Sequence, residues 1–263
     1  MAVITGVIAG FIAWFLKFSI GHLASFFLAF INVAGHNWYI VALPVAGILL
    51  AGIYQRYIVH TNLEHGTRQI SEALARHRYI IDARTAYRPL IASIITLGLG
   101  GSAGAEDPAA TTSAAVGNNI GRLFGVSPEM LVTMIGCGAG AGIAGIFKAP
   151  VGGVLFTLEV LKVPVRTLSV MALFVSSVCG SMTCYALTGY SYDVIFLPTS
   201  LFIPDKIWWV GALGIFCGFY SIYYSKAGDM LTRFFGRIRN PWLLNITGGI
   251  IVGVCLLCFP AMY

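Results

Sequence analysis

The chain has 263 residues, of which 58% are hydrophobic and only 10% are charged, and its mean hydropathy is +0.85. A soluble domain has about 25% charged residues, so this composition excludes a soluble fold and predicts an all-α, polytopic membrane protein. A barrel is excluded because the apolar segments are long and continuous rather than alternating. The net charge of +6 is better explained by cytoplasmic loops than by binding of nucleic acid.

The six cysteines all lie in apolar segments and lack the spacing of metal ligands, so we expect small buried side chains. Cys255 and Cys258 form a CxxC pair in the middle of an expected membrane helix, where a redox or metal role is the minor alternative. We expect neither a metal ion nor an organic cofactor. The cysteines are Cys137, Cys179, Cys184, Cys217, Cys255 and Cys258.

The N-terminal part predicts two membrane spans followed by a basic surface segment. The first span, 2–31, includes Lys17, whose side chain either snorkels to the interface or faces the protein interior. The second span covers 37–58. Residues 56–88 hold six arginines against three acidic residues, so the positive-inside rule places them in the cytoplasm. Within them, 67–78 predicts a short helix that lies at the membrane surface or partly re-enters it.

The rest of the chain predicts further helices, several of them interrupted. The apolar run 90–104 is shorter than the ~20 residues of a full span, and the helix after Pro108 is too polar to face lipid. A cap at Ser127 begins a helix whose small residues, 136–145, predict close packing of neighbouring helices. Pro150 restarts another helix. The later helices are expected at 169–189, 207–231 and 242–259, with a loop over 191–205, all within one domain, 1–263.

A pair of carboxylates in apolar surroundings is the strongest functional signal, within the glycine-rich stretch 98–126. Glu106 and Asp107 are costly to bury in a membrane, which favours a function. Pro108 fits the first turn of a helix, whose N–H groups and positive dipole end then form a site for an anion. Broken helices of membrane transporters bind anions in this way. The alternative is that both acids only cap a helix at the membrane surface.

Several motifs carry a family resemblance. The segment GSAGAEDP, 101–108, resembles the GREGP segment of the CLC family of chloride channels and chloride/proton exchangers, with Ala105 in place of the family's arginine and Asp107 in place of its second glycine. NNIGRLF at 118–124 reinforces it, and FKAPVGGVLFTLE at 147–159 resembles the family's FNAPLAG helix. EHGT at 64–67 stands where the family has its GSGIP anion-binding loop. These segments follow one another in the family's order.

The resemblance implies a polytopic bundle with broken, re-entrant helices, which is the first inverted repeat plus about two further helices. The family's GxFxP motif and pore tyrosine do not occur, so we expect the second repeat to be largely missing. Glu106 matches the gating glutamate, which competes with chloride and carries protons. The backbone around the turn and the inner loop would bind the anion, with His65 either taking part or pointing elsewhere. The implied anion-binding residues are His65, Gly66, Gly104, Ala105, Asp107 and Ala109.

The implied function is passive or proton-coupled transport of chloride, or a similar small anion, by a homodimer in a bacterial inner membrane. The exchangers' cytoplasmic proton acceptor falls at Val160, and a valine there resembles the channel branch of the family. One alternative is a truncated, non-transporting fragment that needs a partner chain. Fluoride as the transported anion is another. A third is a membrane-embedded enzyme that uses Glu106 and Asp107, with only Thr111, Thr112 and Ser113 nearby as nucleophiles.

Overall fold

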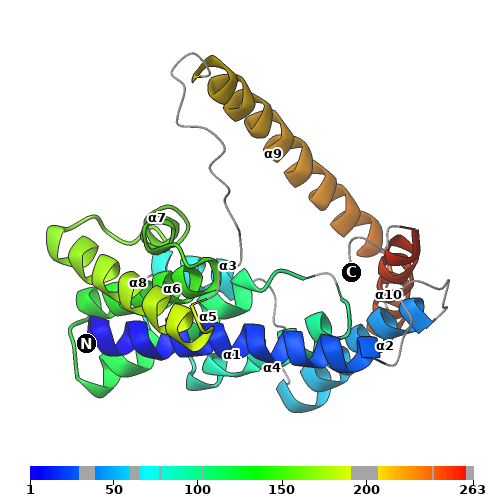
Figure 1. Cartoon of the computed structure of the whole chain (residues 1–263), viewed down its shortest axis with the longest axis horizontal. Coiled ribbons are helices and arrows are strands. Elements are labelled where there is room, and N and C mark those ends of the chain that lie inside the picture. Colours follow the sequence, from blue (N-terminus) through cyan, green and yellow to red (C-terminus); the bar gives the residue numbers. More distant parts are fainter. Residues whose placement is uncertain are drawn as a thin grey trace. The chain divides into compact units, whose positions relative to one another are not determined.

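The structure, a computed structural model, describes residues 1–29, 39–59, 66–76, 79–101, 103–190, 207–238 and 240–258. Within these ranges the chain is helical and contains no strand, which confirms the all-α prediction. The helices are α1 (Ala2–Ala29), α2 (Tyr39–Tyr54), the π-helical η1 (Gln55–Val59), α3 (Gly66–Ala75), the 3-10 turn η2 (Ala83–Ala86), α4 (Arg88–Gly98), α5 (Glu106–Leu123), α6 (Pro128–Phe147), α7 (Pro150–Glu159), α8 (Thr167–Leu187), α9 (Ile207–Phe235) and α10 (Pro241–Cys258) (Figure 1).

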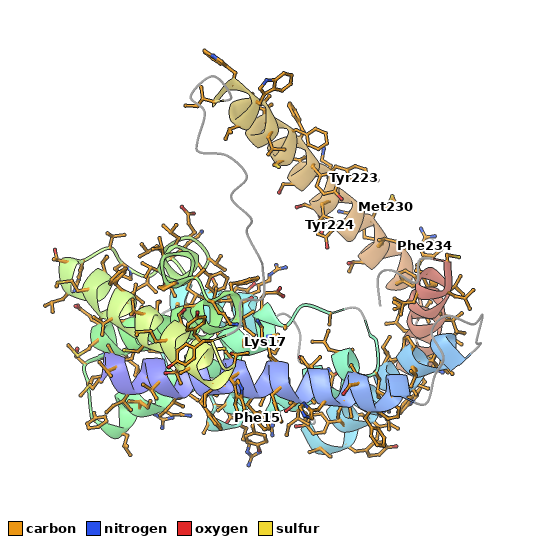
Figure 2. All side chains as sticks on the ribbon, in the orientation of Figure 1. Phe15, Lys17, Tyr223, Tyr224, Met230 and Phe234 are labelled. Atoms are coloured by element: carbon orange, nitrogen blue, oxygen red, sulfur yellow. The ribbon has the colours of Figure 1, made fainter. Side chains whose placement is uncertain are left out.

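Six of the described helices are long and apolar enough to cross a membrane: α1, α2 with its η1 extension, α6, α8, α9 and α10. The interrupted helices α3, α4, α5 and α7 lie among them in the chain, as the sequence predicts. Lys17, near the middle of α1, is half-buried, so it faces the protein in part (Figure 2).

Local sequence signals set several helix boundaries. Ser127 is the N-cap of α6, and its Oγ accepts a hydrogen bond from the Met130 N–H at 3.4 Å. Lys148 ends α6 in the left-handed conformation, with φ of 53°, and Pro150 then begins α7. The predicted cap and the predicted restart are both confirmed.

The helix α6 is the centre of the packed bundle and contacts α1, α5, α7 and α8. The helix α1 runs along α5, α6 and α8 (Figure 1). A Cβ added to Gly138 would lie 2.0 Å from the carbonyl oxygen of Ser113 on α5, and one added to Gly140 would lie 2.9 Å from the carbonyl oxygen of Gly153 on α7. Only glycine permits these backbones to approach so closely, so the predicted role of residues 136–145 in close packing is confirmed.

Asn118, on α5, fixes the segment that precedes α4. This asparagine is fully buried; its amide nitrogen donates to the Tyr79 carbonyl at 2.6 Å, and its oxygen accepts from the Ile81 N–H at 3.2 Å. A buried amide with both ends satisfied tethers the chain firmly. The first asparagine of the NNIGRLF motif therefore has a structural task, which is to hold residues 79–81 against α5.

The chain divides into two compact units. The first, Met1–Ser191 with Asn245–Tyr263, contains α1 to α8 and most of α10, and the second, Tyr192–Leu244, contains α9. The side chains of α9 project on several sides of the helix, among them Tyr223, Tyr224, Met230 and Phe234 (Figure 2). The expected single domain stays a prediction, and the expected loop over 191–205 lies outside the described residues.

The prediction that every cysteine is buried is wrong in part. Cys137 and Cys184 are buried in the bundle and Cys179 is half-buried, but Cys217 on α9 and Cys255 and Cys258 on α10 are exposed. On α10 the small residues Gly249 and Gly253 face the packed side, which leaves the CxxC pair elsewhere on the helix. Among the described residues, no group of three or more histidine, cysteine, aspartate or glutamate side chains is arranged to hold a metal ion.

Candidate functional site

The turn between α4 and α5 begins where α4 ends, at Gly98. Gly100 has φ of 80°, the Gly100 N–H donates to the Leu97 carbonyl at 3.0 Å, and the Gly101 N–H donates to the Thr96 carbonyl at 2.8 Å. These bonds close the last helical turn, and the positive φ is one that glycine adopts without strain. The helix therefore stops well before residue 104, which bounds the predicted run, and the described residues 99–101 and 103–105 are not helical.

The first turn of α5 has backbone N–H groups that make no hydrogen bond within the helix. The helix begins at Glu106, and the Ala109 N–H already donates to the Ala105 carbonyl at 3.2 Å. Pro108 has no N–H. Helix geometry leaves the N–H groups of Glu106 and Asp107 without an intrahelical acceptor, at the positive end of the helix dipole. The predicted position of Pro108 in the first turn is confirmed.

Asp107 joins the start of α5 to the start of α3. One carboxylate oxygen, Oδ2, accepts from the Gly66 N–H at 3.2 Å, and the other, Oδ1, accepts from the Thr67 N–H at 2.9 Å. The Thr67 hydroxyl also donates to Oδ1. The N-termini of two helices thus meet at one half-buried carboxylate.

Thr111 lies one turn further along α5 and packs against the same end of α3. Its side chain is 1% exposed, and its hydroxyl has no hydrogen-bond partner among the described residues. A Cβ added to Gly66 would lie 2.4 Å from the Thr111 hydroxyl oxygen, so the close approach of α3 and α5 requires glycine at this position.

These residues line a cavity of about 580 Å³ within the first unit. Its wall combines the start of α3 and the first turns of α5 with side chains from α2, α4, α10 and the η2 turn. Much of this wall is polar, which is unusual between apolar helices and lets the cavity hold a polar guest. The polar lining residues are Gln55, Gln69, Asp82, Thr85, Arg88, Ser93, Thr96, Asp107, Thr111 and Asn245.

The two neighbouring acids lie in different surroundings. Glu106 is exposed and is not among the residues that line the cavity. Its carboxylate lies beside Gly104, where a Cβ would come 2.3 Å from Oε2. Asp107 is half-buried and lines the cavity. Although these two residues are consecutive on α5, the carboxylate of Glu106 is exposed, whereas that of Asp107 accepts hydrogen bonds from three donors.

The predicted anion-binding residues come together only in part. Gly66 and Asp107 lie at the cavity, Gly104 is exposed beside Glu106, and Ala105 immediately precedes α5. Ala109 is fully buried, with its N–H bonded within the helix. His65 lies outside the described residues. The roles assigned to these six residues stay predictions.

Thr67, the last residue of the EHGT segment, and Arg88 belong to this site but are not among the residues that the sequence predicts to bind an anion. A threonine at the start of a polar helix is a capping signal and could have pointed to Thr67. The sequence places Arg88 only among the basic residues of the cytoplasmic segment, yet this residue lines the cavity. The helix that contains Thr111 is predicted to be too polar to face lipid, and the buried side chain of Thr111 agrees with that prediction.

Sequence comparisons identify a family and relatives. Residues 46–263 match the sequence profile of the family described as voltage gated chloride channel. The chain is 28% identical over 233 residues to a ClcB-like protein of Ralstonia nicotianae, whose name places it with the chloride channels, covering 86% of this chain and 54% of that protein. It is 25% identical over 268 residues to the H(+)/Cl(-) exchange transporter ClcA of Klebsiella pneumoniae, covering 97% of this chain and 56% of that protein. The chain thus spans about half the length of these relatives.

A solved structure has the same fold. The crystal structure of a slow cyanobacterial Cl-/H+ antiporter matches with a TM-score of 0.80 and 24% identity, covering 98% of this chain and 63% of that one. The predicted CLC-like, multi-pass membrane fold is confirmed. The matched family and the two relatives named above are channels and transporters, so the comparisons give no support to the alternative of a membrane-embedded enzyme.

Proposed function

The chain belongs to the family of voltage gated chloride channels, and from this we propose that it forms part of a membrane pathway for chloride or a similar small anion, gated by Glu106. The observation that supports the proposal most is the meeting of the N-termini of α3 and α5 at one polar cavity. Two positive helix ends directed at the same space attract an anion.

The backbone is suited to bind an anion weakly enough to release it. N–H groups carry partial charges, so they hold an anion without trapping it as a lysine would, and conduction requires such moderate binding. In this proposal the N–H groups at Gly66 and at the first turn of α5 bind the anion. His65 stands next to Gly66 in the chain, and Gly104 and Ala105 shape the approach to Glu106.

In this proposal Glu106 acts as the gate. Its side chain is exposed at the first position of α5, so it can move without breaking a buried contact. Ionised, it competes with an anion for the positive end of the helix, and protonated it withdraws. Protons therefore affect the flow of the anion even if they are not transported with it.

The residue at the expected cytoplasmic proton acceptor does not favour strict coupling of proton transport to anion transport. Val160, where the resemblance places the exchangers' proton acceptor, cannot carry a proton, and its carbonyl accepts a hydrogen bond from the Ser71 hydroxyl of α3 at 3.2 Å. We therefore propose passive conduction first, with proton-coupled exchange as the alternative. Fluoride remains the alternative anion.

The chain spans about half of its relatives, so the proposed pathway includes protein outside this half. A second copy in a homodimer or a partner chain would complete it, in the bilayer of a bacterial inner membrane. The alternative is that the chain is a non-transporting fragment. The experiment must distinguish this alternative from a chain that transports an anion.

The test is ion flux from liposomes that contain the purified chain and are loaded with chloride, with chloride and pH electrodes read together. We expect chloride efflux that Glu106→Gln changes. Glu129→Gln is the matched control, because Glu129 is also an exposed acid in the first turn of a helix but lies on α6 and pairs with Arg166. Efflux of chloride should be the same for this control and the wild type.

Each outcome decides one part of the proposal. Proton uptake together with chloride efflux would identify an exchanger, and efflux alone would identify a channel. A fluoride electrode in place of the chloride electrode compares the two anions. No efflux above that of empty liposomes would refute transport by this chain alone and would favour the fragment.

A further inference from the structure

Asp107 places a fixed negative charge on the donors that would otherwise bind an anion. The Gly66 and Thr67 N–H groups and the Thr67 hydroxyl all donate to its carboxylate. A capping carboxylate ordinarily belongs to the residue that precedes its own helix. This one comes from another helix, 41 residues further along the chain.

The carboxylate also lies at the start of its own helix. Asp107 is the second residue of α5, so it is close to the positive ends of both α3 and α5. Charge-assisted hydrogen bonds of this kind are about twice as strong as neutral ones. An anion that enters here meets donors that are already occupied.

The cavity beside Asp107 holds a polar group that lacks a partner. The Thr111 hydroxyl is buried, lines the cavity, lies against Gly66 and has no hydrogen-bond partner among the described residues. Leaving a buried hydroxyl unpaired is costly. Of the six buried hydroxyls without a partner among the described residues, only that of Thr111 belongs to a residue lining this cavity, so an acceptor that enters the cavity beside α3 would satisfy it. Arg88, which lines the same cavity, adds a positive charge.

We propose that Asp107 is an internal competitor for the transported anion. Its carboxylate occupies the α3 donors when the cavity is empty, and an anion binds there, with the Thr111 hydroxyl, only when the carboxylate leaves them. The inference rests on the proposed function, since the competing anion is the one that the pathway carries. Asp107 is distinct from Glu106, which is exposed beside Gly104 and does not line the cavity.

The test compares bromide and chloride binding to the full 263-residue chain in detergent by isothermal titration calorimetry. Asp107→Asn keeps an oxygen acceptor of the same reach but removes the charge, so we expect about tenfold tighter halide binding, the difference between charged and neutral hydrogen bonds. Asp107→Gly removes the competitor altogether and should bind at least as tightly. Elution volume and circular dichroism establish that each variant is folded.

Asp82→Asn is the matched control. Asp82 lines the same cavity, but its carboxylate accepts a hydrogen bond from the Arg84 N–H rather than from α3. Removing this charge should tighten halide binding much less than Asp107→Asn does. Amide hydrogen–deuterium exchange, measured on the peptide fragment that contains Gly66 and Thr67, then locates the binding site. In the Asp107→Asn variant, bromide should slow the exchange of these amides.

The outcomes separate this inference from the proposed function. Equal halide affinity in the wild type and both Asp107 variants, or binding in none of them, would overturn the inference and leave Asp107 as a structural cap between α3 and α5. An equal gain from Asp82→Asn would also overturn it, because general charge repulsion would then explain the effect. Halide binding that tightens in the Asp107 variants supports the inference even if liposomes show no flux, in which case only the transport proposal fails.

Discussion

The helix α5 has two neighbours that it meets in opposite ways. Along its middle it meets α6 through backbone contacts, where Gly138 lies directly against the Ser113 carbonyl and leaves no space for a side chain. At its start it meets α3 through hydrogen bonds of Asp107, beside a polar cavity. The α5–α6 interface excludes any guest, whereas the α3–α5 junction has room for one.

The difference shows how a rigid element can present an exchangeable site. Close-packed backbones tolerate no change of volume, so α5 is held firmly along its length. Hydrogen bonds at its first turn can be replaced one for one by those of another acceptor, at little net cost. The proposed anion pathway needs such a fixed helix with replaceable contacts at its positive end.

Replacing Gly138 with alanine should break the α5–α6 interface and have the largest effect. The new Cβ would lie 2.0 Å from the Ser113 carbonyl oxygen, so the two backbones must separate. Overpacking at a site that cannot yield costs about 3 kcal/mol or more. The measurement is thermal unfolding in detergent, followed by circular dichroism.

The control for this change is Gly152→Ala on α7. The nearest atom to its added Cβ is 3.5 Å away, an ordinary contact, so alanine should be neutral or stabilise the helix by up to about 1 kcal/mol. If both variants unfold at the same temperature, the tight contact of α5 with α6 is not what stabilises the bundle.

Replacing Gly66 with alanine should disturb the α3–α5 junction by a smaller amount. The added Cβ would meet the Thr111 hydroxyl at 2.4 Å, so α3 must move away from α5 and loosen its bonds to Asp107. We expect a loss of about 1–2 kcal/mol in unfolding free energy. Thr111→Ala removes the side-chain atoms that clash and should restore much of it.

A double-mutant cycle measures this rescue. Because the two residues touch, their effects on unfolding free energy should be coupled by more than about 0.5 kcal/mol. Strict additivity of Gly66→Ala and Thr111→Ala would contradict the close approach of α3 and α5.

The surface ion pair of Arg166 with Glu129 should have the smallest effect. The two side chains are 65% and 74% exposed, so solvent screens the pair. Glu129→Gln should change the unfolding free energy by less than about 1 kcal/mol, and high salt should reduce the change further. A larger loss of unfolding free energy that salt does not change would contradict this prediction. It would mean that the ion pair on the surface stabilises the bundle as much as the packing of α5 does.

Local signals in the sequence predicted much of the fold. Ser127 and Pro150 mark helix starts because capping and the missing N–H of proline act over only a few residues. The small residues of α6 predicted close packing for a similar reason, since absent side chains permit approach by any neighbour. The sequence does not predict the end of α4 at Gly98, because several glycines follow one another and each could end the helix.

The sequence predicts only part of the candidate site. The start of α5 at Glu106 followed from Pro108 and the acids beside it. The bonds of Asp107 to Gly66 and Thr67 join residues about 40 positions apart, and nothing local in either segment predicts which donors a carboxylate will meet. The same holds for Arg88, which joins the cavity only because α4 packs beside α5.

The sequence by itself determined that this is a helical membrane protein with broken helices, because hydropathy, prolines and small residues act locally, and its motifs carried the resemblance to the CLC family. Only the tertiary structure decided which of two adjacent acids enters the cavity. Neighbouring residues on a helix point in directions about 100° apart, so packing, rather than composition, sends Asp107 to α3 and leaves Glu106 exposed.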